Sequence, residues 1–217
     1  MRAIVMRHTG DADRLQLETV PTPEPRPGWV RIRVHAEGVC YRDIVERRGG
    51  FAFIKQPVVP GHEFAGVVDA CGEGVTAFAP GDRVVNLHRA ACGECPACTS
   101  GHETRCRRAL EVFGLSVDGG YAEYVVAPVG CLVPLPEPIP FEQACFLNCT
   151  AAVALRALRG AARLQSGETV LVTGASGGVG IHAVQVAKAL GARVLATTTN
   201  PDKLETLRDH GVDEAIV

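Results

Sequence analysis

The stretch VLVTGASGGVG at residues 170–180 decides the fold of the second half of the chain. It runs from an apolar, β-branched segment through a glycine-rich turn into residues 181–190, whose apolar spacing is helical. Glycine lets the backbone turn tightly and approach a pyrophosphate, whose charge is favoured at a helix N-terminus. Because a strand precedes the turn and a helix follows it, the stretch predicts a dinucleotide-binding turn rather than a tight turn without a ligand. The residues expected at the cofactor are Gly174, Ser176, Gly177, Gly178, Val179 and Gly180.

The segments around this turn repeat the alternation of strand and helix. Residues 193–197 are expected to form a strand, residues 201–210 a helix and residues 214–217 the start of a third strand. This order is typical of a parallel α/β sheet. Residues 141–163, rich in Ala and Leu without Pro, are expected to be helical. We place the domain boundary here, which gives domains of residues 1–147 and 148–217.

The end of the second strand bears on the choice between NAD and NADP. An NAD-specific site carries an acidic side chain about twenty residues after the glycine turn, where it binds the ribose 2′-hydroxyl. Here that place reads TTTN at residues 197–200, with Lys203 just beyond. We expect Thr198 and Thr199 to donate hydrogen bonds to a 2′-phosphate and Lys203 to neutralise it, which favours NADP. The alternative is that Lys203 is only a solvated residue at a helix start.

The first half of the chain has the pattern of a β domain. Residues 30–36 alternate apolar and polar side chains with period two, and residues 67–70 and 83–87 are similar. A Pro-Gly-Asp turn at residues 80–82 separates the last two. Short strands at this spacing predict a barrel-like β domain.

Four of the nine cysteines lie within fifteen residues, at Cys92, Cys95, Cys98 and Cys106. Zinc prefers tetrahedral coordination by sulfur, and four protein ligands leave no open position, so this set predicts a structural zinc site. An iron–sulfur cluster is the first alternative, although in bacterial ferredoxins the last spacer is shorter and a proline follows. Four unligated thiols are the second.

A second, open metal site is suggested by scattered ligand-type residues. Cys40 and the pair His62 and Glu63 follow β segments, and Cys149 lies near the domain boundary. A catalytic zinc needs about three protein ligands and a free position. Each residue also has a plainer interpretation, because lone cysteines often pack in cores and a His-Glu pair is often a salt-bridged turn.

Composition limits the remaining classes. The chain has 217 residues, a net charge of −2 and 47% hydrophobic residues, close to ordinary globular proteins. No apolar run approaches the roughly 18 residues of a membrane span, and residues 1–8 lack the apolar core of a secretory signal. Near-zero charge without basic runs argues against nucleic acid as a partner. We therefore expect a cytoplasmic protein that acts on a small molecule, with neither membrane nor nucleic acid as partner.

These motifs, taken in order, resemble one family. The sequence carries GVC-x2-D from Gly38, GHE-x2-G from Gly61, the four-cysteine lobe, DGGYAEY from Asp118 and the glycine turn. Together they are similar to the zinc-containing medium-chain dehydrogenase/reductase superfamily, which includes the alcohol dehydrogenases.

The resemblance implies a fold and a ligand set. The fold is a GroES-like β-barrel catalytic domain followed by a Rossmann domain. The catalytic zinc would be held by Cys40, His62 and Cys149, with Glu63 a nearby or alternate ligand. Asp43 would orient His62, and the four-cysteine lobe would hold a second zinc ion.

Two departures qualify the resemblance. Alcohol dehydrogenases usually have Ser or Thr at the place of Arg42, whose permanent charge prevents it from relaying a proton but suits it to bind a carboxylate or phosphate. The sequence CYRD at residues 40–43 is instead similar to the acryloyl-coenzyme A reductase branch, which reduces an activated carbon–carbon double bond with NADPH.

The second departure is length. Only 37 residues follow the glycine turn, enough for half of a Rossmann sheet. The resemblance thus implies a C-terminally truncated chain without the region through which relatives dimerise. The leading expectation is an NADP(H)-dependent zinc oxidoreductase that acts on an aldehyde, a ketone or an enoyl thioester. The alternative is a catalytically incompetent fragment that binds zinc and nucleotide.

Overall fold

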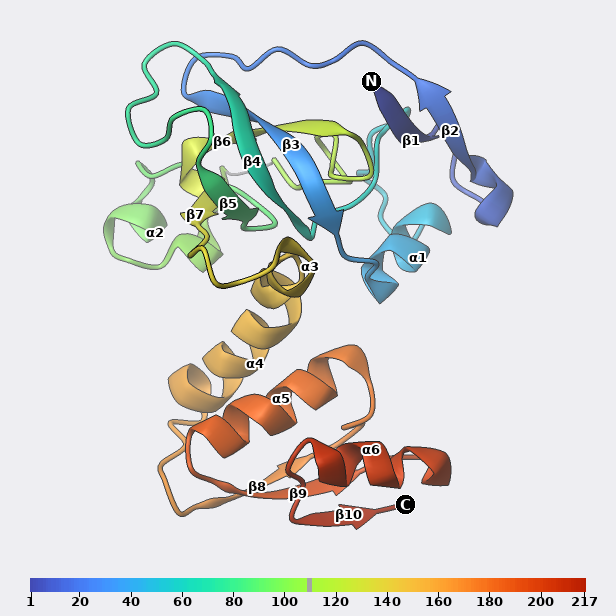
Figure 1. Cartoon of the computed structure of the whole chain (residues 1–217), viewed down its shortest axis with the longest axis vertical. Helices are drawn as coiled ribbons and strands as arrows, with labels where there is room; N and C mark the ends of the chain where they lie inside the picture. The colour runs from blue at the N-terminus through green and yellow to red at the C-terminus, as the bar shows by residue number, and fades with distance from the viewer. Residues whose placement is uncertain (109–110) are drawn as a thin grey trace. The chain divides into compact units, whose positions relative to one another are not determined.

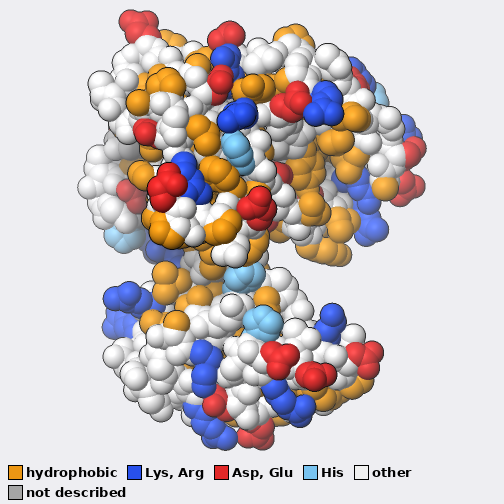
Figure 2. Space-filling view, in the orientation of Figure 1, with side chains coloured by type: hydrophobic (Ala, Val, Ile, Leu, Met, Phe, Trp, Pro, Cys, Tyr) orange, Lys and Arg blue, Asp and Glu red, His pale blue; other side chains and the backbone are white. Residues whose placement is uncertain are grey.

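A computed structural model describes residues 1–108 and 111–217 of the chain. It divides into two compact units, Met1–Phe146 and Leu147–Val217 (Figure 1). The described residues contain no helix with the length and apolar character needed to traverse a bilayer. On the face that Figure 2 displays, acidic and basic side chains are interspersed over both units, in keeping with the small net charge.

The first unit is built on a five-stranded antiparallel sheet with strand order β6-β3-β4-β5-β7. The strands are β3 (Trp29–Glu37), β4 (Phe64–Cys71), β5 (Arg83–Asn86), β6 (Tyr124–Pro128) and β7 (Leu132–Pro134). Two register irregularities between β3 and β4 accompany the curl of this sheet, because bulges increase local twist and bend. A separate antiparallel pair joins β1 (Arg2–Met6) and β2 (Leu15–Thr19). The predicted barrel-like β domain is therefore confirmed as a curled, half-barrel sheet.

The core of this unit lies on one face of the sheet. Val30, Ile32 and Phe64 are completely buried there, as the alternating pattern of β3 requires. Each such side chain contributes about 1.5–3 kcal/mol through removal of apolar surface from water. Phe64 meets Phe113 edge to face, with 5.1 Å between ring centroids. This packing fixes the start of β4, directly after His62 and Glu63.

The first unit also contains short helices. They are α1 (Tyr41–Arg47), α2 (Pro96–Thr99) and α3 (Phe141–Ala144), with 3-10 turns η1 (Ala12–Arg14), η2 (Glu103–Arg105) and η3 (Val129–Cys131). Helix α1 begins at a capping box, in which Cys40 and Asp43 exchange side-chain and backbone hydrogen bonds.

The second unit contains the predicted alternation of strand and helix. Strands β8 (Thr169–Val172), β9 (Arg193–Thr197) and β10 (Glu214–Ile216) form a parallel sheet in the order β8-β9-β10. Helix α5 (Gly178–Ala189) connects the first two strands, and η6 (Pro201–Lys203) with α6 (Leu204–Asp209) connects the last two. Val184, Val194 and Leu207 are buried between helices and sheet. The α/β class is confirmed.

The helical segment before β8 is less regular than its composition suggests. A π-helical turn, η4 (Leu147–Ala151), leads into α4 (Ala152–Leu155) and a second π-helical segment, η5 (Arg156–Ala161). Arg163 has a φ of +54°, the left-handed conformation that commonly ends a helix.

Candidate metal centres and nucleotide-binding turn

The four cysteines of the lobe come together at one point. Their sulfur atoms lie within 4.8 Å of one another, and three pairs are 3.4 Å (Cys95–Cys98), 3.8 Å (Cys92–Cys98) and 3.9 Å (Cys95–Cys106) apart. These separations match the edge of a zinc tetrahedron, which is about 3.8 Å for Zn–S bonds of about 2.3 Å. They are much longer than a disulfide bond.

Electrostatics in the lobe also calls for a cation. Burial, followed by the hydrogen bond with Cys95, raises the pKa of the Cys98 thiol to about 12. Backbone N–H groups of Cys92 and Cys95 donate to the sulfurs of Cys106 and Cys92, each at 3.4 Å. Four thiolates side by side repel one another unless a cation joins them. The donor set fits one zinc ion with no open position.

A second cluster in the first unit brings together Cys40, His62 and Glu63. Their ligand-type atoms lie within 4.8 Å of one another, although Cys40 and His62 are 22 positions apart in the sequence. Cys40 caps the N-terminus of α1, just after β3, whereas His62 and Glu63 immediately precede β4. The antiparallel pairing of β3 with β4 places these two ends side by side. A thiol, an imidazole and a carboxylate therefore lie together at one point of the first unit.

The cluster passes a test for a cation. His62 is fully buried, and its Nε2 lies 3.8 Å from Oε1 of Glu63. That carboxylate oxygen is itself buried and accepts no hydrogen bond from the described residues. A buried carboxylate oxygen without a partner is costly unless a cation or proton satisfies it. Sulfur, nitrogen and oxygen donors of this kind fit zinc.

Asp43 orients the imidazole from the other side of the ring. Its Oδ1 lies 3.1 Å from Nδ1 of His62, while its Oδ2 accepts hydrogen bonds from the Cys40 N–H at 2.8 Å and from the Tyr121 hydroxyl at 2.9 Å. Burial alone would raise the pKa of Asp43, but the hydrogen bonds from His62, Cys40 and Tyr121 outweigh it and lower the pKa. An ionised Asp43 holds the Nδ1 proton and leaves Nε2 for a metal ion.

Arg42 is held by two groups of the first unit. Its Nε forms an ion pair with Glu46 one helical turn along α1, and its Nη2 donates to the Phe113 carbonyl at 2.6 Å. The Glu46 side chain is only 1% exposed, and burial raises its pKa to about 7 despite Arg42. Two donor atoms of Arg42 thus bind groups of the protein itself, and its binding of a substrate carboxylate or phosphate stays a prediction. Sequence reasoning missed Glu46, whose only signal was the i,i+4 spacing to Arg42.

Cys149, the remaining candidate ligand, lies in the second unit. It is half-buried in the π-helical turn η4. Its part in the open metal site stays a proposal, developed below.

The glycine-rich turn of the second unit has the predicted geometry. A cavity of about 440 Å³ is lined by Ala154, Ala157, Leu158, Ala183 and residues 170–174 and 177–180. Helix α5 starts at this cavity, so its first N–H groups are available to an anion. A Cβ on Gly180 would overlap the carbonyl oxygen of Gly174, whereas a Cβ on Gly178 would meet no protein atom within 4 Å. Gly180 thus closes the turn, and Gly178 leaves its outer side open.

Of the residues expected to favour NADP over NAD, one is buried and two are exposed. Thr198 is 4% exposed; its hydroxyl lies 2.8 Å from the Ser176 hydroxyl and accepts from the Asn200 N–H at 3.1 Å. This placement favours a structural role for Thr198 over the expected bond to a 2′-phosphate. Thr199 and Lys203 are exposed beyond β9, and Ser176 and Val179 are exposed at the turn.

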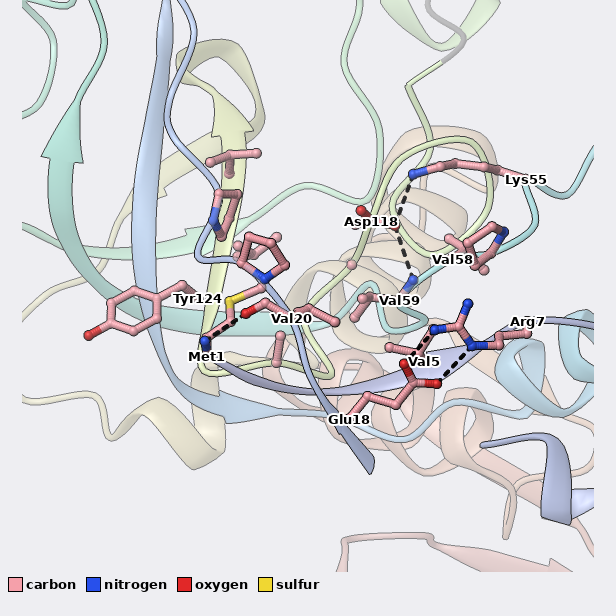
Figure 3. Close-up of a pocket in the computed structure, with 17 residues that line it drawn as sticks. Met1, Val5, Arg7, Glu18, Val20, Lys55, Val58, Val59, Asp118 and Tyr124 are labelled. Carbon is pink, nitrogen blue, oxygen red and sulfur yellow. Dashed lines mark hydrogen bonds and ion pairs between the residues drawn. The ribbon is translucent and has the colours of Figure 1, made fainter. Parts of the chain in front are cut away.

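A further cavity of about 300 Å³ lies in the first unit, and its lining includes none of the residues predicted to bind metal or cofactor (Figure 3). Its apolar wall includes Val58 and Val59, and two ion pairs border it, Arg7 with Glu18 and Lys55 with Asp118. One wall is therefore the segment that leads directly to His62.

Comparison with known proteins adds family information. The family model described as alcohol dehydrogenase GroES-like domain matches residues 26–137, and that described as zinc-binding dehydrogenase matches residues 178–217. The chain is 40% identical over 210 residues to the acryloyl-coenzyme A reductase of Sulfurisphaera tokodaii, covering 97% of this chain and 62% of that protein. It is 40% identical over 201 residues to an alcohol dehydrogenase of Geobacillus stearothermophilus, covering 92% and 59%.

Solved structures give the same result. The structure of AibC matches with a TM-score of 0.95 at 43% identity, covering 100% of this chain and 61% of AibC. The chain therefore spans about three fifths of the length of these relatives.

Proposed function

Because the chain belongs to the zinc-containing medium-chain dehydrogenase/reductase superfamily, we propose that it is an NADP(H)-dependent zinc oxidoreductase that reduces an enoyl thioester such as acryloyl-coenzyme A. The observation that carries the proposal is the convergence of Cys40, His62 and Glu63 within 4.8 Å. The parallel α/β unit with its glycine turn supports the nucleotide half of the function.

The residues of the open site have separate tasks. Cys40, His62 and, from the second unit, Cys149 would hold a zinc ion, with Glu63 as a nearby or alternate ligand. Zinc bound there supplies a Lewis acid that polarises a substrate carbonyl. Asp43 fixes the imidazole tautomer through its contact with Nδ1 of His62.

The second unit would bind the cofactor. Backbone N–H groups at the start of α5 face the cavity where the pyrophosphate would lie. Thr199 and Lys203 supply a hydroxyl and a positive charge where an NAD-specific site carries a carboxylate. We therefore assign the 2′-phosphate of NADP to Thr199 and Lys203.

Arg42 favours reduction of a double bond over alcohol oxidation. An alcohol dehydrogenase must carry the alcohol proton away, and a guanidinium held by Glu46 and the Phe113 carbonyl cannot accept it. With NADPH bound, reduction of an enoyl thioester would transfer a hydride to the β-carbon and a proton to the α-carbon and would leave NADP⁺.

A second candidate is reduction of an aldehyde or ketone, which the similarity to an alcohol dehydrogenase favours. NADPH oxidation with acryloyl-coenzyme A and with a panel of aldehydes distinguishes the two. Turnover of the thioester alone supports the proposal, and turnover of aldehydes alone overturns it. Bound zinc without turnover of any substrate would favour a zinc- and nucleotide-binding fragment.

Replacing Lys203 with alanine is expected to weaken NADPH binding by about tenfold to a hundredfold and leave NADH binding unchanged, because a charge-assisted bond to phosphate contributes roughly 1.5–3 kcal/mol. Fluorescence titration with both cofactors measures the ratio. Arg208→Ala, which removes another basic residue of the same helical region, is the matched control. Equal losses for NADPH and NADH would contradict the assignment of Lys203.

A further inference from the structure

The motif DGGY at residues 118–121 has no role in the function proposed so far, yet it lies against the metal-ligand segment. The Gly119 N–H donates to the Val59 carbonyl at 2.7 Å, and the Tyr121 N–H donates to the Pro60 carbonyl at 3.0 Å. The Asp118 carboxylate accepts from the Val59 N–H at 3.1 Å and from Lys55 Nζ at 3.2 Å (Figure 3). These hydrogen bonds hold the segment that ends at His62.

The approach of the two segments requires glycine. A Cβ on Gly119 would overlap the carbonyl oxygen of Gly61, the residue just before His62. Any other residue at position 119 would push the two backbones apart. The motif therefore lies in direct contact with the backbone that carries His62.

Tyr121 reaches the same ligand by a second route. Its hydroxyl donates to Oδ2 of Asp43 at 2.9 Å, beside the Cys40 N–H at 2.8 Å, and Oδ1 of Asp43 lies 3.1 Å from Nδ1 of His62. Asp43 lies on α1, 78 residues from Tyr121 in sequence. A carboxylate held at both oxygens cannot rotate, so the direction of the imidazole is fixed as well.

We infer that Tyr121 is a positioning residue for the metal-binding imidazole of His62 and acts through Asp43. We also infer that the DGGY motif holds in place residues 59–63, which carry His62 and Glu63. The inference rests on the proposed metal site at Cys40 and His62. The hydroxyl of tyrosine matters here, because a phenylalanine keeps the ring but removes one of the two donors to Oδ2 of Asp43 and leaves the Cys40 N–H.

Cobalt(II) binding to the full chain tests the inference. Removing the outer partner of a metal-bound histidine typically lowers metal affinity 10–100-fold, and Tyr121 acts one step further out, so Tyr121→Phe should weaken cobalt binding at the open site about tenfold. Competition with a chromophoric chelator gives the affinity, and the visible ligand-field band reports a changed geometry. The four-cysteine lobe serves as an internal standard, whose affinity should not change.

Tyr124→Phe is the matched control, because Tyr124 lies on β6 three residues along and its ring lies beneath Arg31. Wild-type affinity and band in Tyr121→Phe would overturn the inference, as would an equal loss in Tyr124→Phe. Wild-type chain that binds cobalt only at the four-cysteine lobe would instead contradict the proposed metal site. Gly119→Ala provides a second test through the backbone: it should weaken the open site and spare the lobe.

Discussion

Arg42→Met is expected to lower the free energy of unfolding by about 3 kcal/mol at pH 8.5, the lower end of the range for breaking a buried ion pair. The carboxylate of Glu46 would lose its ion pair in a position where its side chain is only 1% exposed. The Phe113 carbonyl would lose its hydrogen bond from Nη2 at the same time. Denaturant unfolding of the zinc-loaded chain measures the difference.

The pH dependence identifies Glu46 as the cause. Burial is the main cause that raises the pKa of Glu46 from 4.5 to about 7 in the folded chain. The contribution of the protonated Glu46 to stability is therefore complete below about pH 4.5 and is lost as the pH rises through 7. Without Arg42 the pKa of Glu46 in the folded chain rises further. Glu46 then stays protonated in the folded chain at a pH where it is ionised in the unfolded chain, and the free energy of unfolding falls as the pH rises. We therefore expect a smaller Arg42→Met effect at pH 6, where only the hydrogen bond to the Phe113 carbonyl is lost, and a larger one at pH 8.5.

A double variant completes this test. Arg42→Met with Glu46→Gln should recover most of the stability at pH 8.5, because replacing both members of a buried pair is far less costly than removing one. An Arg42→Met loss that is equal at pH 6 and pH 8.5, or a double variant no better than the single one, would contradict this account of the pair.

Gly180→Ala is expected to remove nucleotide binding and to destabilise the second unit by about 3 kcal/mol, the upper end for overpacking. The added Cβ would overlap the carbonyl oxygen of Gly174 and lie 2.7 Å from the Cα of Ala175, and both are backbone atoms that cannot move aside. The start of α5 would separate from the turn after β8, and the cofactor cavity between them would be lost. Thermal unfolding and NADPH titration give the two effects.

Gly178→Ala is the informative comparison. Its Cβ would meet no protein atom within 4 Å, so the stability should stay within about 1 kcal/mol of wild type. NADPH affinity should nevertheless fall, because the methyl group would occupy the space through which the pyrophosphate approaches the turn. Unchanged NADPH affinity in Gly178→Ala would show that the cofactor does not lie against this turn.

Local sequence was sufficient where the chemistry is local. The glycine turn could be predicted because strand, turn and helix follow one another within residues 170–190. The four-cysteine lobe could be predicted because one short segment carries all four sulfurs. The convergence of Cys40 with His62 and Glu63 was only suggested by ligand type, since it depends on the pairing of β3 with β4.

The side-chain partners of several residues depend on tertiary contacts and could not be predicted from the sequence. The hydrogen bond between Tyr121 and Asp43 joins residues 78 positions apart, and no periodicity in the sequence predicts it. The sequence shows the charge of Arg42 but not which groups it contacts, and the fold pairs its Nε with Glu46. Thr198 resembles its exposed neighbour Thr199 in sequence, but the alternation of sides along the strand end buries one and exposes the other.

The zinc content of the purified 217-residue chain tests the central claim most directly. Elemental analysis should find two zinc ions per chain in the wild type, one in His62→Ala and one in Cys106→Ser, because each substitution removes a ligand from a different site. A wild-type chain with a single zinc ion that is retained in His62→Ala and lost in Cys106→Ser would contradict the account, since the cluster of Cys40, His62 and Glu63 would then hold no metal.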